Sequence, residues 1–222
     1  MAPFALQVIG LIFGGLGMIG AFAVAAMPQW RVSAFIGGNI VIFENIWEGL
    51  WKNCVYQVHI KMQCKYYDTV LALPPVLEVS RGLMCVAVIL SVIGFLLTIT
   101  GMKCTRCVGD NNRVRSIILL AAGSIFIISG ILVLIPVSWT AYNIIRDFYN
   151  PAIHAGHKRE LGAALYLGWL SSALLIIGGA LFCSFYRRGD KHRRGKYSSH
   201  ACHGLPNSEY METKAQTKHA YV

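Results

Sequence analysis

The sequence predicts a mainly α-helical membrane protein with a small β component: a four-helix transmembrane bundle that carries an extracellular antiparallel β-sheet. Three observations support this fold class. The chain holds four apolar runs of about 20 residues, the length that crosses the hydrocarbon core of a membrane. It is 55% hydrophobic and only 14% charged, whereas a soluble domain carries about a quarter charged residues. Between the first two runs lies a long segment with strand-like alternation and two cysteines.

The four apolar runs are predicted to be membrane-spanning helices. The first is longer than the core of a signal peptide, and no basic residue precedes it, so we expect it to remain as a helix. None of the four contains Asp, Glu, Lys, Arg or His. Because transporters and proton pumps usually keep ionisable groups at membrane depth, we expect this bundle to be a scaffold. The spans cover about residues 5–27, 82–102, 117–138 and 161–185.

Small residues recur along the first span at spacings of three and four. Such a stripe lets helices approach closely, either inside one bundle or at a dimer face. We favour packing inside the bundle. The stripe consists of Gly10, Gly14, Gly17 and Ala21.

The basic charge lies in two segments of the chain. Residues 103–116 hold four Lys or Arg and one Asp, and residues 186–222 hold eight Lys or Arg and three acidic residues. By the positive-inside rule these segments, and with them both termini, are cytoplasmic. The tail 186–222 has few apolar residues and is expected to be disordered. The basic charge flanks apolar spans and forms no separate domain, which argues against a nucleic-acid partner.

The first outer loop, about residues 28–81, is the expected working part of the chain. Its residues 28–67 alternate in a way that predicts the strands of the outer sheet. Of the seven cysteines, only Cys54 and Cys64 fall on the oxidising side, so we predict that they form a disulfide that clips a hairpin. Closing a loop of this length stabilises the fold by about 3 kcal/mol.

Two further elements are expected outside the membrane. Residues 69–73 predict a short helical turn, ended by the two prolines that follow. In the second outer loop, about residues 139–160, the third helix is expected to continue past its span, because Ile144 and Phe148 stand at helical spacing. The dipeptide 150–151 then predicts a turn.

The remaining cysteines have several interpretations. Cys104 and Cys107 form a Cys-x-x-Cys pair at the cytoplasmic membrane edge. The alternatives for this pair are S-palmitoylation, free thiols and a metal site. Lipidation is the favoured interpretation, because no second pair of ligands stands nearby. Cys183 has the same interpretations, and Cys85 is expected to be inert packing within a span.

We find no constellation that predicts catalysis. No Ser, His and Asp set falls within one folded segment, and no glycine-rich phosphate loop follows a strand. His154 and His157 are separated by three positions, but Gly156 and Pro151 predict an irregular loop there, so solvated side chains are expected rather than a metal site. The sequence therefore predicts a protein that is not an enzyme and that has no metal or cofactor.

The first outer loop resembles the first extracellular segment of the claudins. The resemblance rests on Trp30, the tripeptide Gly49-Leu50-Trp51, Cys54, Cys64 and Arg81, and it extends over about residues 1–185. The segments 28–35 and 144–151 are most similar to the claudin eight and claudin seventeen branch. The resemblance implies a tight-junction protein of the plasma membrane. Such protomers would polymerise with claudins in one membrane and across cells, and so seal the gap between the cells.

The resemblance also implies roles for individual residues. Val70, or Leu71 beside it, would dock into a pocket on the next protomer. Phe148, Tyr149 and Leu161 stand at the positions that line this pocket in claudins. Packing within one chain is the alternative. Lys65 stands at a pore-facing position. It would favour anions such as chloride, act as a cation barrier without a pore, or have no role because Asp68 offsets its charge. The C-terminal Tyr221 and Val222 would bind a PDZ scaffold of the junction.

A different functional class shares part of this pattern. Four-helix adhesion proteins and auxiliary subunits of other membrane proteins have the same arrangement of Trp, Gly-Leu-Trp and two cysteines. They do not polymerise into the strands that claudins form at tight junctions. The region 146–149 and the Tyr-Val end favour a claudin. Strand formation at contacts between junction-free cells that express the chain would separate the two classes.

Overall fold

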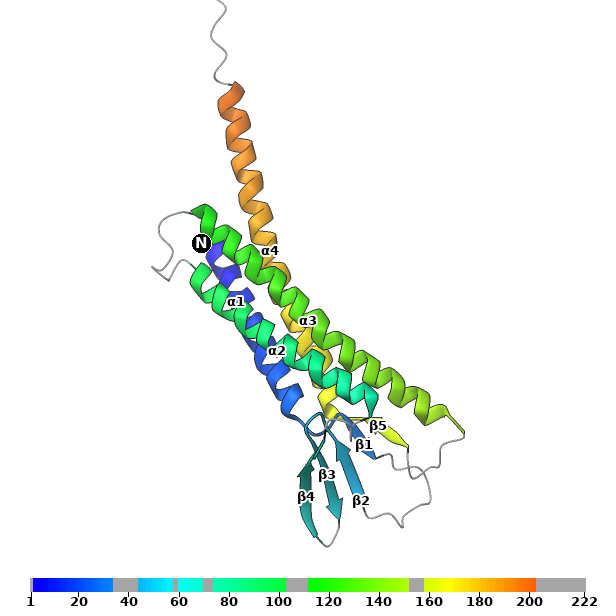
Figure 1. Ribbon diagram of the computed structural model, residues 1–222. Coiled ribbons are helices and arrows are strands. Elements are labelled where there is room, and N and C mark those ends of the chain that lie inside the picture. The colour runs from blue at the N-terminus through cyan, green and yellow to red at the C-terminus, as the bar shows by residue number, and fades with distance from the viewer. Residues whose placement is uncertain are drawn as a thin grey trace, which may run out of the picture. The chain divides into compact units, whose positions relative to one another are not determined.

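The structure, a computed structural model, describes most of the chain. Four helices form a bundle, and a small sheet lies at one end of it (Figure 1). All four helices are long and apolar enough to span a membrane, which confirms the predicted fold class. The described ranges are 2–33, 44–57, 60–69, 74–102, 112–151 and 158–202.

The helices follow the four apolar runs. The end of α2, the start of α3 and the N-terminus all lie at the end of the bundle opposite the sheet (Figure 1). The chain divides into two units, Met1–Phe185 and Tyr186–Val222, and the bundle and the sheet belong to the first. The helices are α1 (Ala2–Ala26), α2 (Pro75–Gly101), α3 (Asn112–Tyr149) and α4 (Ala163–Cys202).

Helix α2 begins seven residues before the expected start of its span at residue 82. Pro75 occupies the first turn, where its fixed φ and missing N–H are compatible with a helix. Glu78 also lies in that turn, where a negative charge is favourable. The prolines therefore start a helix rather than only ending a turn, and Arg81 belongs to α2 and not to a loop. Of the expected turn at 69–73, residues 70–73 lie outside the described ranges.

The outer part of α3 agrees with its periodicity, because the helix continues beyond the expected span to Tyr149. The fourth helix starts two residues after the expected start of its span, about residue 161. Residues Arg159–Leu161 form a strand, and α4 starts at Ala163. The same helix extends as far as Cys202, whereas the tail was expected to be disordered from residue 186. Residues 186–202 hold six Lys or Arg and no proline, and Lys and Arg are good helix formers.

The sheet has five antiparallel strands in the order β4-β3-β2-β1-β5. Four come from the first outer loop, as the alternation predicted. The fifth, β5, comes from the second outer loop and pairs with β1, so the sheet joins both loops (Figure 1). The strands are β1 (Arg31–Ser33), β2 (Glu44–Glu48), β3 (Lys52–Gln57), β4 (Ile60–Tyr66) and β5 (Arg159–Leu161).

The bundle is held together by close packing of small residues against aromatic rings. A Cβ atom added at Gly10 would lie 3.1 Å from the Phe182 ring, and one added at Gly14 would lie 2.9 Å from the Phe126 ring. Both rings are fully buried. The small-residue stripe of α1 therefore packs inside the bundle, as favoured from the sequence. A hydroxyl adds a polar link, because Ser129 donates to the Ala87 carbonyl across α3 and α2 at 2.7 Å.

Candidate functional site

The candidate functional site is the outer sheet together with its attachment to the bundle. Trp30 makes the first attachment, just after α1. Its side chain is fully buried, and its indole Nε1 donates to the Val24 carbonyl at 2.9 Å. Its backbone N–H donates to the Glu48 carbonyl at 3.1 Å. One tryptophan thus satisfies a free carbonyl near the end of α1 and fixes where the sheet begins.

The turn between β2 and β3 inserts into the junction between sheet and bundle. Leu50 is fully buried there. A Cβ atom at position 49 would collide with the backbone of Pro28, so only glycine permits this close approach. The Gly49 N–H also donates to the Lys52 carbonyl at 3.1 Å, which closes the turn. The Gly-Leu pair therefore anchors the hairpin.

Trp51 completes this anchor through a residue of α2. The guanidinium carbon of Arg81 lies 3.9 Å from the centroid of the Trp51 ring. A cation over an aromatic face contributes about 0.5–2 kcal/mol, depending on how far the pair is desolvated. The two motif residues, 30 positions apart in the sequence, thus contact each other and join the sheet to α2.

The disulfide fixes the outer hairpin. Cys54 on β3 pairs in register with Cys64 on β4, and their sulfur atoms are bonded. Cys54 is buried, whereas Cys64 is exposed. The cross-link therefore holds the exposed strand β4 against the more buried strand β3. Lys65, the next residue on β4, pairs in register with Asn53.

Lys65 and Asp68 form an exposed ion pair beside the disulfide. The Lys65 Nζ lies 2.7 Å from the Asp68 Oδ2, and the two side chains are 79% and 75% exposed. The hydrogen bond to Asp68, followed by its charge, raises the pKa of Lys65 above its ordinary value. Both residues line a hollow of about 410 Å³ on the β3–β4 hairpin, together with Asn53 and Gln63. Both charges are thus largely accessible to ions in solution, and each partly neutralises the other.

A second ion pair, less exposed, ties β5 into the sheet. The Arg159 Nη2 lies 2.7 Å from the Glu48 Oε1, and the two side chains are 21% and 17% exposed. The charges of this ion pair also act on the hydroxyl of Tyr67. Burial, followed by the Glu48 charge, raises the pKa of its hydroxyl, while Arg31 and Arg159 act in the opposite direction. This cluster couples the second outer loop to the first.

Close backbone contact at Gly162 strengthens that coupling. A Cβ atom at this position would overlap the carbonyl oxygen of Gln29. The Gly162 N–H donates to the Trp30 carbonyl at 3.3 Å, and the Ala164 N–H donates to the Gln29 carbonyl at 3.1 Å. The start of α4 is therefore packed directly on the segment that follows α1.

Sequence reasoning missed Glu48, Arg159 and Gly162. Glu48 and Arg159 are single charges within the two outer loops, and Gly162 is one of 22 glycines in the chain. None of these local signals distinguishes the residue from others of its type. The partners lie more than 100 positions apart, so no periodicity relates them. The expected sheet was confined to residues 28–67, which left no reason to place a strand at 159–161.

The structure separates the residues expected at the protomer contact. Tyr149, at the end of α3, is 79% exposed and forms an edge-to-face pair with Phe148 at 5.6 Å between ring centroids. The Lys158 Nζ lies 5.4 Å from the Phe148 ring. Leu161 instead stands on β5 and packs against the core of its own chain.

Several expected site residues fall outside the described ranges, so the structure does not place them. Cys183 is described: it is a free, partly buried cysteine of α4. In the part of the chain that the structure describes, no cluster of three His, Cys, Asp or Glu side chains is arranged to hold a metal ion. The expected site residues outside are Val70, Leu71, Cys104, Cys107, Tyr221 and Val222. His154 and His157, which were expected to be solvated, lie outside as well.

Comparison with known proteins gives consistent matches over most of the chain. The PMP-22/EMP/MP20/Claudin family matches residues 4–182. Claudin-8 of Mus musculus is 58% identical over 198 residues, which cover 89% of this chain and 88% of that protein. Claudin-17 of Sus scrofa is 56% identical over 197 residues, with the same coverage. Claudin-4 of Bos taurus is 50% identical over 212 residues, covering 95% of this chain and all of that protein.

Proposed function

From the premise that the chain belongs to the PMP-22/EMP/MP20/Claudin family, we propose that it forms tight-junction strands whose ion selectivity is set by Lys65. Family membership makes it a multi-pass membrane protein of the tight junction that assembles with claudins, and not an enzyme. The proposed strands seal the gap between cells and favour anions over cations. The observation that carries the selectivity is the exposed ammonium of Lys65 beside the Cys54–Cys64 disulfide.

The position of Lys65 suits a selectivity role. Its backbone is held by pairing with Asn53 and by the neighbouring disulfide, so the charge has a defined place on the hairpin. The ammonium is protonated throughout the physiological pH range, because the ordinary pKa of lysine already lies well above that range. An exposed charge acts within about 8 Å at physiological salt, so it affects ions that pass close to the sheet.

Asp68 moderates this charge. At 2.7 Å it offsets the ammonium, and a tightly closed pair would present little net field to a passing ion. However, an exposed pair of this kind contributes little stability and opens readily. We infer that Lys65 attracts anions or repels cations when the pair is open, and that Asp68 limits the size of the effect.

The selectivity proposal is tested by dilution potentials across one epithelial line that expresses the wild-type chain, Lys65→Glu or Asp68→Asn. We expect a chloride preference for the wild type, a stronger one for Asp68→Asn, and a sodium preference for Lys65→Glu. Freeze-fracture images serve as the control that all three form strands. A barrier without a pore would show higher sodium permeability in Lys65→Glu at constant chloride permeability. Equal permeability ratios for the wild type and Lys65→Glu would reject a role for this residue.

Strand assembly is proposed to use the outer end of α3. Tyr149 is mostly exposed and projects beside Phe148, so the two rings provide an apolar surface for residues 70–71 of a neighbouring protomer. Leu161 contributes less directly, because it packs on its own core. Tyr149→Ala is expected to shorten or abolish strands. Tyr142→Ala, which alters another exposed tyrosine about two turns earlier on the same helix, is the matched control. Equal strand lengths in both variants would contradict the proposal.

The proposed orientation places both termini in the cytoplasm. The N-terminus and the basic start of α3 lie at the end of the bundle opposite the sheet (Figure 1), as the positive-inside rule requires. We further propose that Tyr221 and Val222 bind a junctional PDZ scaffold. A chain that lacks these two residues should lose scaffold pull-down but keep strands. Full scaffold binding by the truncated chain would contradict this role.

Cys104, Cys107 and Cys183 are proposed as sites of S-palmitoylation. A single acyl chain adds only marginal membrane affinity, so removal of these thiols should lower partitioning into membrane domains without unfolding the bundle. Acyl exchange on the wild-type chain measures the modification directly. Absence of label on the wild type would end this proposal.

A further inference from the structure

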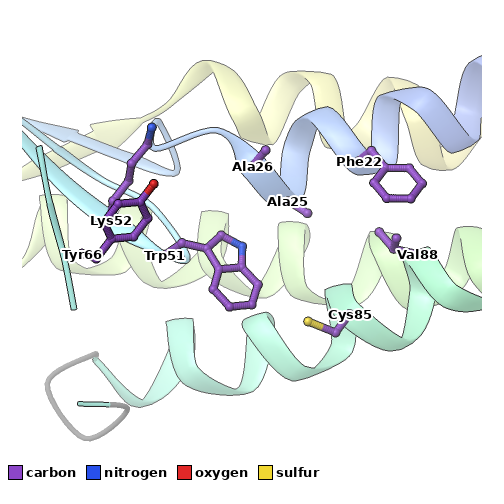
Figure 2. Close-up of a pocket in the computed structure, with 8 residues that line it drawn as sticks. All are labelled: Phe22, Ala25, Ala26, Trp51, Lys52, Tyr66, Cys85 and Val88. Atoms are coloured by element: carbon purple, nitrogen blue, oxygen red, sulfur yellow. The ribbon is translucent and has the colours of Figure 1, made fainter. Parts of the chain in front are cut away.

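A hollow of about 460 Å³ lies where α1, α2 and the outer hairpin meet (Figure 2). This volume is within the range of pockets that bind small molecules, about 300–1,000 Å³. Its lining comes from all three elements, and we call it the interface groove. The lining residues are Phe22, Ala25 and Ala26 of α1, Cys85 and Val88 of α2, and Trp51, Lys52 and Tyr66 of the hairpin.

The interface groove is polar at one end and apolar at the other. Figure 2 shows Lys52 and Tyr66 close together at the sheet end, with Phe22 and Val88 at the far end and the Trp51 ring between them. Lys52 and Tyr66 are register partners on β3 and β4, so the sheet holds an ammonium and a hydroxyl side by side. Within the described ranges, Lys52 forms no ion pair.

The depth of the groove matches this polarity. Phe22 and Val88 lie within the candidate spans Ala5–Ala26 and Pro75–Gly101, so in a membrane the apolar end of the groove would lie beside the hydrocarbon of the leaflet on the sheet side. Lys52 belongs to the sheet and lies outside the spans. Trp and Tyr side chains are enriched at the boundary between these zones, and Trp51 and Tyr66 stand there. An occupant with an apolar tail and an anionic oxygen at its head would match both ends.

We propose that the interface groove binds one acyl chain of a phospholipid from the leaflet on the sheet side. The lipid phosphate accepts hydrogen bonds from the Lys52 ammonium and the Tyr66 hydroxyl, and the chain lies along Phe22, Ala25 and Val88. Phospholipid is the chosen occupant because the apolar end opens at hydrocarbon depth while the cation stands at headgroup level. The proposal goes beyond strand formation and ion selectivity, because it assigns a ligand to a separate surface.

The test uses the full chain in phosphatidylcholine nanodiscs that contain a trace of phosphatidylcholine with a photoreactive acyl chain. Peptide mapping locates the cross-links. We expect label on the Phe22–Ala26 and Cys85–Val88 segments to exceed label at Ile89, an exposed lipid-facing residue of α2, by at least about fivefold. Equal labelling would mean that ordinary lipid contact is the only interaction, and would overturn the proposal.

Two matched pairs of variants separate the parts of the site. Val88→Trp fills the groove and should lower groove labelling at least about threefold, whereas Val86→Trp alters an exposed valine on another face of α2 and should not. Lys52→Ala should lower labelling by the phospholipid about fivefold, the effect of one basic residue near a lipid surface. Lys65→Ala, which removes the same charge from β4 outside the groove, should have no effect.

Separate measurements test the contact between the lipid phosphate and Lys52 and test for other occupants of the groove. A photoreactive diacylglycerol lacks the phosphate, so its labelling should be equal in the wild type and Lys52→Ala; an equal loss with both lipids would reject the phosphate contact. If Val88→Trp fails to fold, Cys85→Leu narrows the same groove. Oxidative cross-linking of Cys85 to Cys85 of a second copy, in place of lipid labelling, would show a protein occupant and overturn the proposal.

Discussion

The guanidinium carbon of Arg81 lies 3.9 Å from the ring centroid of Trp51, so a side chain of α2 covers the indole at the tip of the β2–β3 turn. The contact gives a physical reason for the presence of both residues in one motif. Trp30 and Leu50 are buried beside the same junction. The motif is therefore an anchor that sets the position of the sheet relative to the membrane, rather than a site of chemistry.

Arg81→Ala is expected to lower the free energy of unfolding by about 0.5–2 kcal/mol, because the cation over the Trp51 face is lost. Thermal unfolding of the purified chain in detergent measures this change. Arg146→Ala is the control, since that side chain is 62% exposed, and surface substitutions usually change stability by less than about 0.5 kcal/mol. Equal losses in the two variants would show that the ring contact contributes nothing specific.

A double-mutant cycle on Glu48 and Arg159 should reveal a coupling energy larger than that of an exposed pair. Their side chains are only 17% and 21% exposed, so removal of either one leaves a poorly solvated charge. We expect each single change, Glu48→Gln or Arg159→Leu, to cost about 1–3 kcal/mol. Lys65 and Asp68 lie at a similar separation but are exposed, so they provide the matched cycle. The proposal requires no coupling energy between these two residues. A zero coupling energy at Glu48 and Arg159 would contradict a link between the two loops.

Gly162→Ala and Gly82→Ala should have opposite effects on stability. The new methyl at 162 meets the Gln29 carbonyl, which belongs to the backbone and cannot yield, so we expect a loss of about 1–3 kcal/mol. The same methyl at 82 meets nothing within 4 Å in the described structure, and replacing a glycine within α2 should gain up to about 1 kcal/mol. Denaturation in detergent compares the two. A gain at position 162 would be inconsistent with the close contact.

Tyr67 should make the sheet sensitive to alkaline pH. Burial raises the pKa of its hydroxyl above the ordinary value of 10.0, so the folded state favours the neutral form. The associated stability is fully present below the unfolded pKa and is lost as the pH rises through the folded pKa. Tyr67→Phe should therefore reduce the loss of stability above about pH 10. Thermal unfolding between pH 7 and 11 measures the slope, with Tyr149→Phe as the control that removes an exposed hydroxyl. An unchanged slope in Tyr67→Phe would rule out this contribution.

The sequence by itself determined the four helices and the location of the sheet. A span must supply about 20 apolar residues in one continuous run, and such runs are visible without knowing any partner. The strands of the first loop were visible for a related reason, because alternation is a local pattern. The spacing of Ile144 and Phe148 likewise predicted that the third helix continues past its span, and α3 extends to Tyr149.

Only the tertiary structure decided how these parts are joined. Arg159–Leu161 is a three-residue strand because β1 supplies its partner, and three residues carry no pattern of their own. The start of α2 at Pro75 placed Arg81 on a helix, facing Trp51. The spacing of Lys65 and Asp68 allows an ion pair, and the fold of the hairpin brings the two charged groups to 2.7 Å. Contacts between distant residues depend on the folded arrangement of the whole chain, whereas helices and spans depend on neighbouring residues.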